Sequence, residues 1–140
     1  MVEPFRVDNR EWRRIARRFG LSFIVIFGSK ASNRKGFKDD VDIAVMAKGV
    51  LRGDVELRLV GEISHTLETD ALDVVVLNFS PPLLQYEVSG SGKLLYEEAA
   101  GLFDRFKFRA LQRWNDNKKF HNLNAVYLKN YLGRKGDAKS

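Results

Sequence analysis

Two stretches of the sequence, Phe23–Ser29 (FIVIFGS) and Asp40–Val45 (DVDIAV), decide the fold. Each is an apolar run rich in β-branched residues and too short for a helix, which is typical of a buried strand. The first run ends in a Gly-Ser pair, and the second, which follows after ten residues, begins with aspartates on alternate positions. Because alternate residues of a strand point to the same face, Asp40 and Asp42 are predicted to project together. The sequence thus predicts two core strands that carry a small-residue turn and a carboxylate pair.

Hydrophobic periodicity predicts further helices and strands around this pair. The predicted elements are helices over 8–19, over 54–67 and from 80 onward, strands over 71–77 and 94–96, and a helical segment from 97 to about 132 with a break at 115–117. Asp8 is expected to cap the first helix and Gly20 to end it. This order predicts the α/β (α+β) class: a small mixed sheet flanked by helices, with a C-terminal helical extension.

The sequence predicts further details for three of these segments. The 71–77 strand is apolar almost throughout, which predicts burial on both of its faces. The glycine-containing stretch 89–93 is predicted to be a turn. The inward stripe of the 54–67 helix is predicted to consist of Leu57, Val60, Ser64 and Leu67.

Length and composition fit one globular domain over 1–140, with a core over about 8–97, a helical segment over 98–132 and a flexible tail over 133–140. The chain has no cysteine, which excludes disulfides and thiolate metal sites. No apolar run approaches the roughly 20 residues of a membrane span, and no secretory signal precedes the first helix. The sequence therefore predicts a cytoplasmic protein without a membrane partner.

The net charge of +6 fits affinity for nucleotide phosphates, for nucleic acid or for an acidic protein. Much of the basic excess, however, lies in three local clusters around 13–18, 34–38 and 134–139, and the aromatic residues do not interleave with them. Nucleic acid is therefore not expected as the primary partner.

The aspartates point to metal-dependent transfer of a phosphate-containing group. A third carboxylate, Asp73, lies near the start of the 71–77 strand and reaches the same site as Asp40 and Asp42 if the two strands are neighbours. Oxygen ligands of this kind suit Mg²⁺ or Mn²⁺, and aspartates around two ions about 3.5–4 Å apart serve in-line phosphoryl or nucleotidyl transfer. Gly28 lets the backbone approach a phosphate closely, and the Ser29 hydroxyl adds a donor.

The combination of Gly28-Ser29, Asp40-x-Asp42 and Asp73 resembles the signature of the DNA-polymerase-β-type nucleotidyltransferase superfamily. The short chain and the run from 77 to 96 resemble the minimal nucleotidyltransferase (MNT) family in particular. The resemblance covers about residues 20–97. The connector departs from the family pattern after Ala31, which leaves open whether Lys30 or Arg34 contacts the triphosphate.

This resemblance implies a function and a partner. Minimal nucleotidyltransferases are commonly antitoxins encoded beside HEPN-domain toxins, and the better understood members transfer AMP from ATP to a toxin tyrosine. By resemblance, Asp40 and Asp42 would ligate two Mg²⁺ ions, and Asp73 would ligate the catalytic ion and help to deprotonate the acceptor. Gly28 and Ser29 would bind the nucleotide triphosphate.

A second hypothesis stays open. The apolar face of the C-terminal helical segment predicts a non-catalytic module that neutralises a partner by binding it. The base preference, the acceptor, the number of nucleotides transferred and the oligomeric state, including a homo-oligomer, also stay open.

Overall fold

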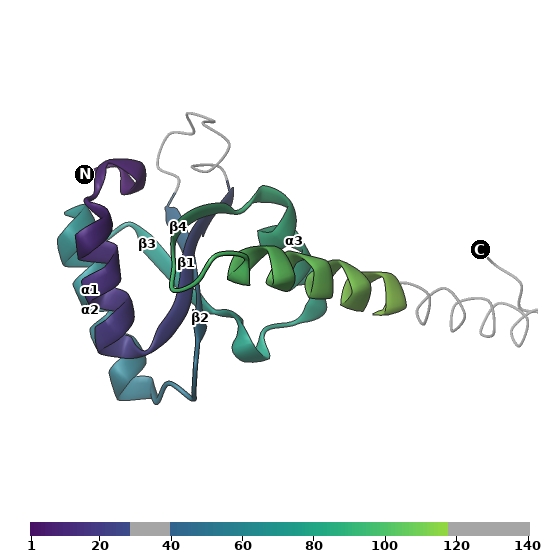
Figure 1. Cartoon of the computed structure of the whole chain (residues 1–140). Helices are drawn as coiled ribbons and strands as arrows, with labels where there is room; N and C mark the ends of the chain where they lie inside the picture. Colours follow the sequence, from purple (N-terminus) through teal and green to yellow (C-terminus); the bar gives the residue numbers. More distant parts are fainter. Residues whose placement is uncertain (29–39, 118–140) are drawn as a thin grey trace, which may run out of the picture.

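A computed structural model of the protein describes residues 1–28 and 40–117 and shows a mixed α/β fold around one sheet (Figure 1). The main elements are α1 (Asn9–Phe19), β1 (Leu21–Phe27), β2 (Val41–Ala47), α2 (Gly53–Leu67), β3 (Leu72–Val76), α3 (Pro82–Ser91) and β4 (Lys93–Glu97). Among the described residues, the short 3₁₀ helix η1 (Pro4–Arg6) precedes α1 and η3 (Leu77–Phe79) follows β3. A further helix, called the C-terminal helix below, covers 102–117 in the described part of the chain.

The sheet has four strands in the order β3-β2-β1-β4. β1 pairs antiparallel with both β2 and β4, whereas β2 and β3 are parallel. The parallel pair requires a crossover connection, which α2 supplies. The predicted fold class is therefore confirmed, and the condition that the two aspartate-bearing strands are neighbours is met.

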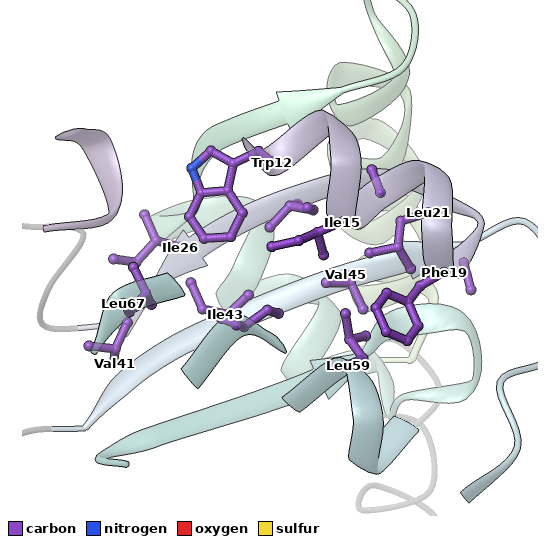
Figure 2. Close-up of a cluster of buried hydrophobic side chains, with 14 residues drawn as sticks. Trp12, Ile15, Phe19, Leu21, Ile26, Val41, Ile43, Val45, Leu59 and Leu67 are labelled. Atoms are coloured by element: carbon purple, nitrogen blue, oxygen red, sulfur yellow. The ribbon is translucent and has the colours of Figure 1, made fainter. Parts of the chain in front are cut away.

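One face of the sheet packs on α1 and α2 (Figure 1). Figure 2 shows the core formed there, in which Trp12 and Ile15 of α1 meet Ile43 of β2 and Leu59 of α2. Trp12 is 1% exposed, and its indole Nε1 donates to the Pro4 carbonyl oxygen at 3.2 Å, so the ring is buried without an unsatisfied polar atom.

The ends of α1 follow the predicted signals. The Asp8 carboxylate accepts a hydrogen bond from the Arg10 backbone N–H at 2.9 Å and caps the helix. Gly20 follows the last helical residue in the left-handed conformation, at φ +64°. Both predictions are confirmed.

The stripe predicted for α2 is wrong except at Leu67, which is buried as expected. The structure buries Leu59, Ile63 and Leu67, whereas Leu57 is 74% exposed. The buried residues are spaced four apart, and the same row begins with Val55, which packs against the core. This row is entirely apolar, whereas the predicted stripe contains Ser64, so burying the apolar row avoids desolvating a hydroxyl.

The other face of the sheet packs on α3 and the C-terminal helix (Figure 1). Phe23 of β1 lies 5.3 Å from Phe103 and 5.5 Å from Phe106, measured between ring centroids. The Glu97 carboxylate, at the end of β4, accepts hydrogen bonds from the backbone N–H groups of Gly101 and Phe103, both at 3.1 Å. A strand residue thus caps the C-terminal helix and fixes its direction.

Three other expectations need correction. β3 is an edge strand with half-buried valines, not a strand buried on both faces. α3 continues through Ser91, so the turn predicted over 89–93 is helical in its first part. Helical residues continue through 115–117, so the expected break does not interrupt the described part of the C-terminal helix. In residues 1–28 and 40–117, no helix has the length and apolar character of a membrane span.

Candidate active site

Asp42 and Asp73 lie next to each other on parallel strands. They are register partners between β2 and β3, and Phe27 is the partner of Asp42 on β1. Ala44 of β2 and Val75 of β3, each two residues further along, face α3 and the C-terminal helix. Because strand residues two apart share a face, both carboxylates belong to that same face, at its uncovered end.

Gly28 brings the end of β1 against the Asp42 carboxylate. Its backbone has φ +76°, and a Cβ built on it would lie 2.5 Å from Asp42 Oδ2. A side chain at this position would meet both a conformational penalty and a steric clash. Glycine is therefore required here by contact with one of the candidate aspartates.

Ser91 holds the same glycine from the other side. The Gly28 backbone N–H donates to Ser91 Oγ at 3.3 Å, and Ser91 Oγ donates to the Glu87 carbonyl oxygen at 3.0 Å. The Gly28 N–H thus has a partner within the protein. In this structure Gly28 leaves room for the Asp42 carboxylate and adopts a left-handed backbone conformation directly after β1.

The remaining predicted site residues lie either outside the Gly28, Asp42 and Asp73 group or outside the described part of the chain. Asp40 is exposed and directly precedes β2. Among the described residues, no three His, Cys, Asp or Glu side chains lie close enough together to hold a metal ion, so Asp40 does not form one cluster with Asp42 and Asp73. Ser29, Lys30 and Arg34 lie outside the described residues.

The Asp42–Asp73 pair fits a magnesium ion through its donor chemistry. Both residues offer carboxylate oxygens, and Mg²⁺ is usually held by one or two protein carboxylates together with substrate phosphate oxygens. Asp42 is half-buried beside Gly28, whereas Asp73 is exposed on the edge strand. Of the two carboxylates, Asp42 therefore lies nearer the interior of the sheet and Asp73 lies nearer solvent.

A groove of about 840 Å³ lies elsewhere, on the α1 and α2 side of the molecule. Asp8, Glu11, His65 and Asp70 are among the residues that line it, and none of the candidate site residues does. An open groove between helix ends offers no paired carboxylates on a strand and no tight glycine turn. We therefore place the candidate site at Asp42, Asp73 and Gly28 on geometric grounds.

Ser91 is a site residue that the sequence did not predict. Its stretch was expected to form a turn, and the contact with Gly28 joins residues 63 positions apart. A serine on the last turn of a helix matches no phosphate-binding or catalytic motif. Only the packing of α3 on the sheet reveals its role.

Comparison with known proteins identifies the family of this chain. The family model described as "Polymerase beta, Nucleotidyltransferase" matches residues 13–100. The chain is 31% identical over 126 residues to "Protein adenylyltransferase MntA" of Aphanizomenon flos-aquae (strain 2012/KM1/D3), with 83% of each chain covered.

Solved structures show the same fold. One, described as a toxin-antitoxin with AMP-PNP, has a TM-score of 0.71 at 20% identity and covers 86% of this chain and 98% of its own. Another, described as the tri-AMPylated Shewanella oneidensis HEPN toxin with its MNT antitoxin, has a TM-score of 0.65 at 20% identity and covers 86% of this chain and 94% of its own. The family match extends from α1 to just beyond β4, the region that holds Gly28, Asp42 and Asp73. The chain thus belongs to the polymerase β-type nucleotidyltransferase family.

Proposed function

We propose that the protein is the antitoxin of a HEPN/MNT pair and transfers AMP from ATP to a hydroxyl of its partner toxin, with tyrosine as the expected acceptor. The observation that carries this proposal is the placement of Asp42 and Asp73 at register-paired positions beside Gly28. The similarity to an adenylyltransferase, and to complexes described as containing a HEPN toxin and AMP-PNP, supports it. The lack of cysteine fits a reducing cytoplasm as its compartment.

The order of the strands suggests how the substrates are arranged. Gly28 directly follows β1, Asp42 lies on the neighbouring β2, and Asp73 lies on the edge strand β3. A triphosphate held by Gly28 and Ser29 would lie on the β1 side. The acceptor hydroxyl would approach from the exposed β3 side, next to Asp73.

The transfer itself follows from this arrangement. The acceptor oxygen attacks the α-phosphorus of ATP, a new P–O bond forms, and the bond to pyrophosphate breaks. The hydroxyl proton passes to the Asp73 carboxylate. Asp42, with Asp40 beside it in sequence, holds the triphosphate end of the site, where Ser29 and either Lys30 or Arg34 supply donors and positive charge.

Asp40, Asp42 and Asp73 are the residues that would hold Mg²⁺, two ions by analogy with the family, with Mn²⁺ as a substitute. When bound, such ions neutralise phosphate charge and lower the pKa of the attacking hydroxyl. The described residues gather two of these carboxylates side by side. We infer that substrate phosphate oxygens supply further ligands.

The test is transfer of label from α-labelled ATP to the product of the neighbouring gene in the presence of Mg²⁺. We expect the wild-type chain to label that product, and Asp42→Asn and Asp73→Asn each to lower the rate by at least about 100-fold. Asp54→Asn on α2 is the matched control, because it removes an exposed carboxylate away from the site and should transfer normally. Absence of label with the wild type, or equal rates for all variants, would contradict the proposal.

Neutralisation by binding alone is the second candidate. Phe108 and Leu111 of the C-terminal helix are 63% and 46% exposed, and they offer an apolar surface to a partner. This function predicts that Asp42→Asn leaves toxin neutralisation intact, whereas Phe108→Ser with Leu111→Ser abolishes it. The catalytic function predicts that Asp42→Asn alone abolishes neutralisation, measured as growth of cells that express the toxin.

A further inference from the structure

We propose that Ser91 is a positioning residue for nucleotide binding, which fixes Gly28 at the end of β1 and, through it, the Asp42 carboxylate. This inference rests on the proposed function and adds to it a residue outside the family signature. Its basis is the hydrogen bond from the Gly28 N–H to Ser91 Oγ, at 3.3 Å, between the end of β1 and the last turn of α3.

The orientation of the Ser91 hydroxyl is set within α3. Its hydrogen points to the Glu87 carbonyl oxygen at 3.0 Å, one helical turn earlier. A hydroxyl has one donor and two acceptor lone pairs, so the oxygen remains able to accept. Ser91 therefore presents an acceptor to Gly28.

The position of α3 is itself held by the C-terminal helix. Arg113 donates to Gln85 Oε1 at 3.0 Å, and the Trp114 ring stacks on Tyr86 with 5.0 Å between centroids. Gly92, which follows Ser91, packs so tightly that a Cβ there would lie 3.0 Å from Phe103 Cζ and 2.3 Å from the Val88 carbonyl oxygen. These contacts leave the end of α3 little freedom to shift away from Gly28.

Fixing Gly28 matters for Asp42, which the proposed function places at the triphosphate end of the site. Gly28 is pressed against Asp42 on one side and held by Ser91 on the other, so its position limits where the Asp42 carboxylate can lie. A site whose groups are already held in place binds its ligand more tightly. Loss of the Ser91 hydroxyl should therefore weaken nucleotide binding without removing a group that contacts the reacting atoms.

The test compares Ser91→Ala with Ser91→Thr and Ser89→Ala. Ser89 lies on the same helix, and its hydroxyl donates to the Tyr86 carbonyl oxygen at 2.7 Å. Ser89→Ala therefore removes a similar hydroxyl that takes no part in the hydrogen bond to Gly28. For Ser91→Ala we expect KM for ATP, and Kd for a non-hydrolysable ATP analogue with Mg²⁺, to rise about 2- to 10-fold, the range of one neutral hydrogen bond. kcat should stay within about 2-fold of wild type, with Ser91→Thr restoring both constants and Ser89→Ala changing neither.

The Gly28 amide gives an independent readout by NMR. We expect Ser91→Ala to shift this resonance and to speed its hydrogen exchange, while Ser89→Ala leaves it in place. Unchanged nucleotide affinity in Ser91→Ala, or an equal loss in Ser89→Ala, would overturn the role of Ser91 while leaving the proposed function standing. A wild-type chain that neither binds nor transfers nucleotide would instead overturn the proposed function, and the role of Ser91 with it.

Discussion

Gly28 and Asp42 are in contact across the β1–β2 pair, so closely that a Cβ on Gly28 would lie 2.5 Å from Asp42 Oδ2. The absence of a side chain on Gly28 thus leaves the space that the Asp42 carboxylate occupies. The contact links the nucleotide side of the site to its aspartates and gives the first prediction.

Gly28→Ala is expected to destabilise the fold and to impair activity. The left-handed backbone costs an alanine about 1–2 kcal/mol, and the clash forces the Asp42 carboxylate to move. Gly20→Ala is the matched control, since Gly20 has φ +64° but open space around its Cβ position. Both variants should lower the urea midpoint, and only Gly28→Ala should also raise KM for ATP. Equal KM values in the two variants would contradict the proposed contact.

Asp42→Asn and Asp73→Asn should impair different steps, nucleotide binding in the first variant and transfer in the second. Asp42 lies beside Gly28, whereas Asp73 lies on the exposed edge strand. We therefore expect Asp42→Asn, which removes a ligand of both proposed ions, to weaken Mg²⁺-dependent binding of an ATP analogue by about 10-fold or more. Asp73→Asn removes a ligand of the proposed catalytic ion alone and should retain binding and lose kcat. Calorimetric titration of each variant with and without a chelator checks this. A greater loss of nucleotide affinity in Asp73→Asn than in Asp42→Asn would contradict the proposed substrate arrangement.

Glu97→Ala should loosen the C-terminal helix. The Glu97 carboxylate accepts two backbone N–H groups at the start of this helix, and its removal leaves them without that partner. We expect a loss of about 1–2 kcal/mol in the free energy of unfolding. Glu98→Ala removes the neighbouring carboxylate, whose partner is Lys48 at the surface, and should cost less than about 1 kcal/mol. Chemical denaturation of both variants tests the difference, and equal losses would contradict a capping role.

Stability should fall in acid partly through Glu11. A hydrogen bond from Arg14 holds the pKa of the Glu11 carboxyl below its ordinary value. A lowered pKa in the folded state means that this contribution is present above the pKa of the unfolded chain and is lost as the pH falls through the folded value. Because the pair lies near the surface, we expect an effect of about 0.2–1 kcal/mol.

Urea unfolding at neutral pH and at about pH 3, with wild type and Glu11→Gln, measures this contribution. The variant should be less stable than wild type at neutral pH and equal to it in acid. High salt should shrink the difference at neutral pH. A difference that persists in acid would point to packing of Glu11 rather than to its charge.

Local sequence patterns predicted the parts of this fold that depend on neighbouring residues. The apolar runs of β1 and β2 and the end signals of α1 are local, and the alternation of β2 correctly placed Asp42 on a face distinct from Ile43. The inward row of α2 was predicted wrongly except at Leu67, because a second row of mainly apolar residues lies along the same helix and only tertiary packing selects between the two.

The parts that failed depend on long-range contacts. No local signal shows that β3 takes the edge of the sheet, since its valines would also suit a central strand. Ser91 gained its role only when α3 packed against the end of β1. The triphosphate contacts of Ser29, Lys30 and Arg34 lie outside the described residues and stay predictions.

The aromatic contacts of the C-terminal helix bear on how mutations in this gene will behave. Phe103, Phe106 and Ala110 belong to the same buried cluster as Phe23 of β1. A nonsense mutation after Glu97 would therefore uncover the sheet face that carries Asp42 and Asp73, and replacing even one such phenylalanine by alanine typically costs about 3–5 kcal/mol. Late stop codons should abolish catalysis and partner binding together, so separating the two activities genetically requires missense alleles, either at the aspartates or on the outer side of this helix.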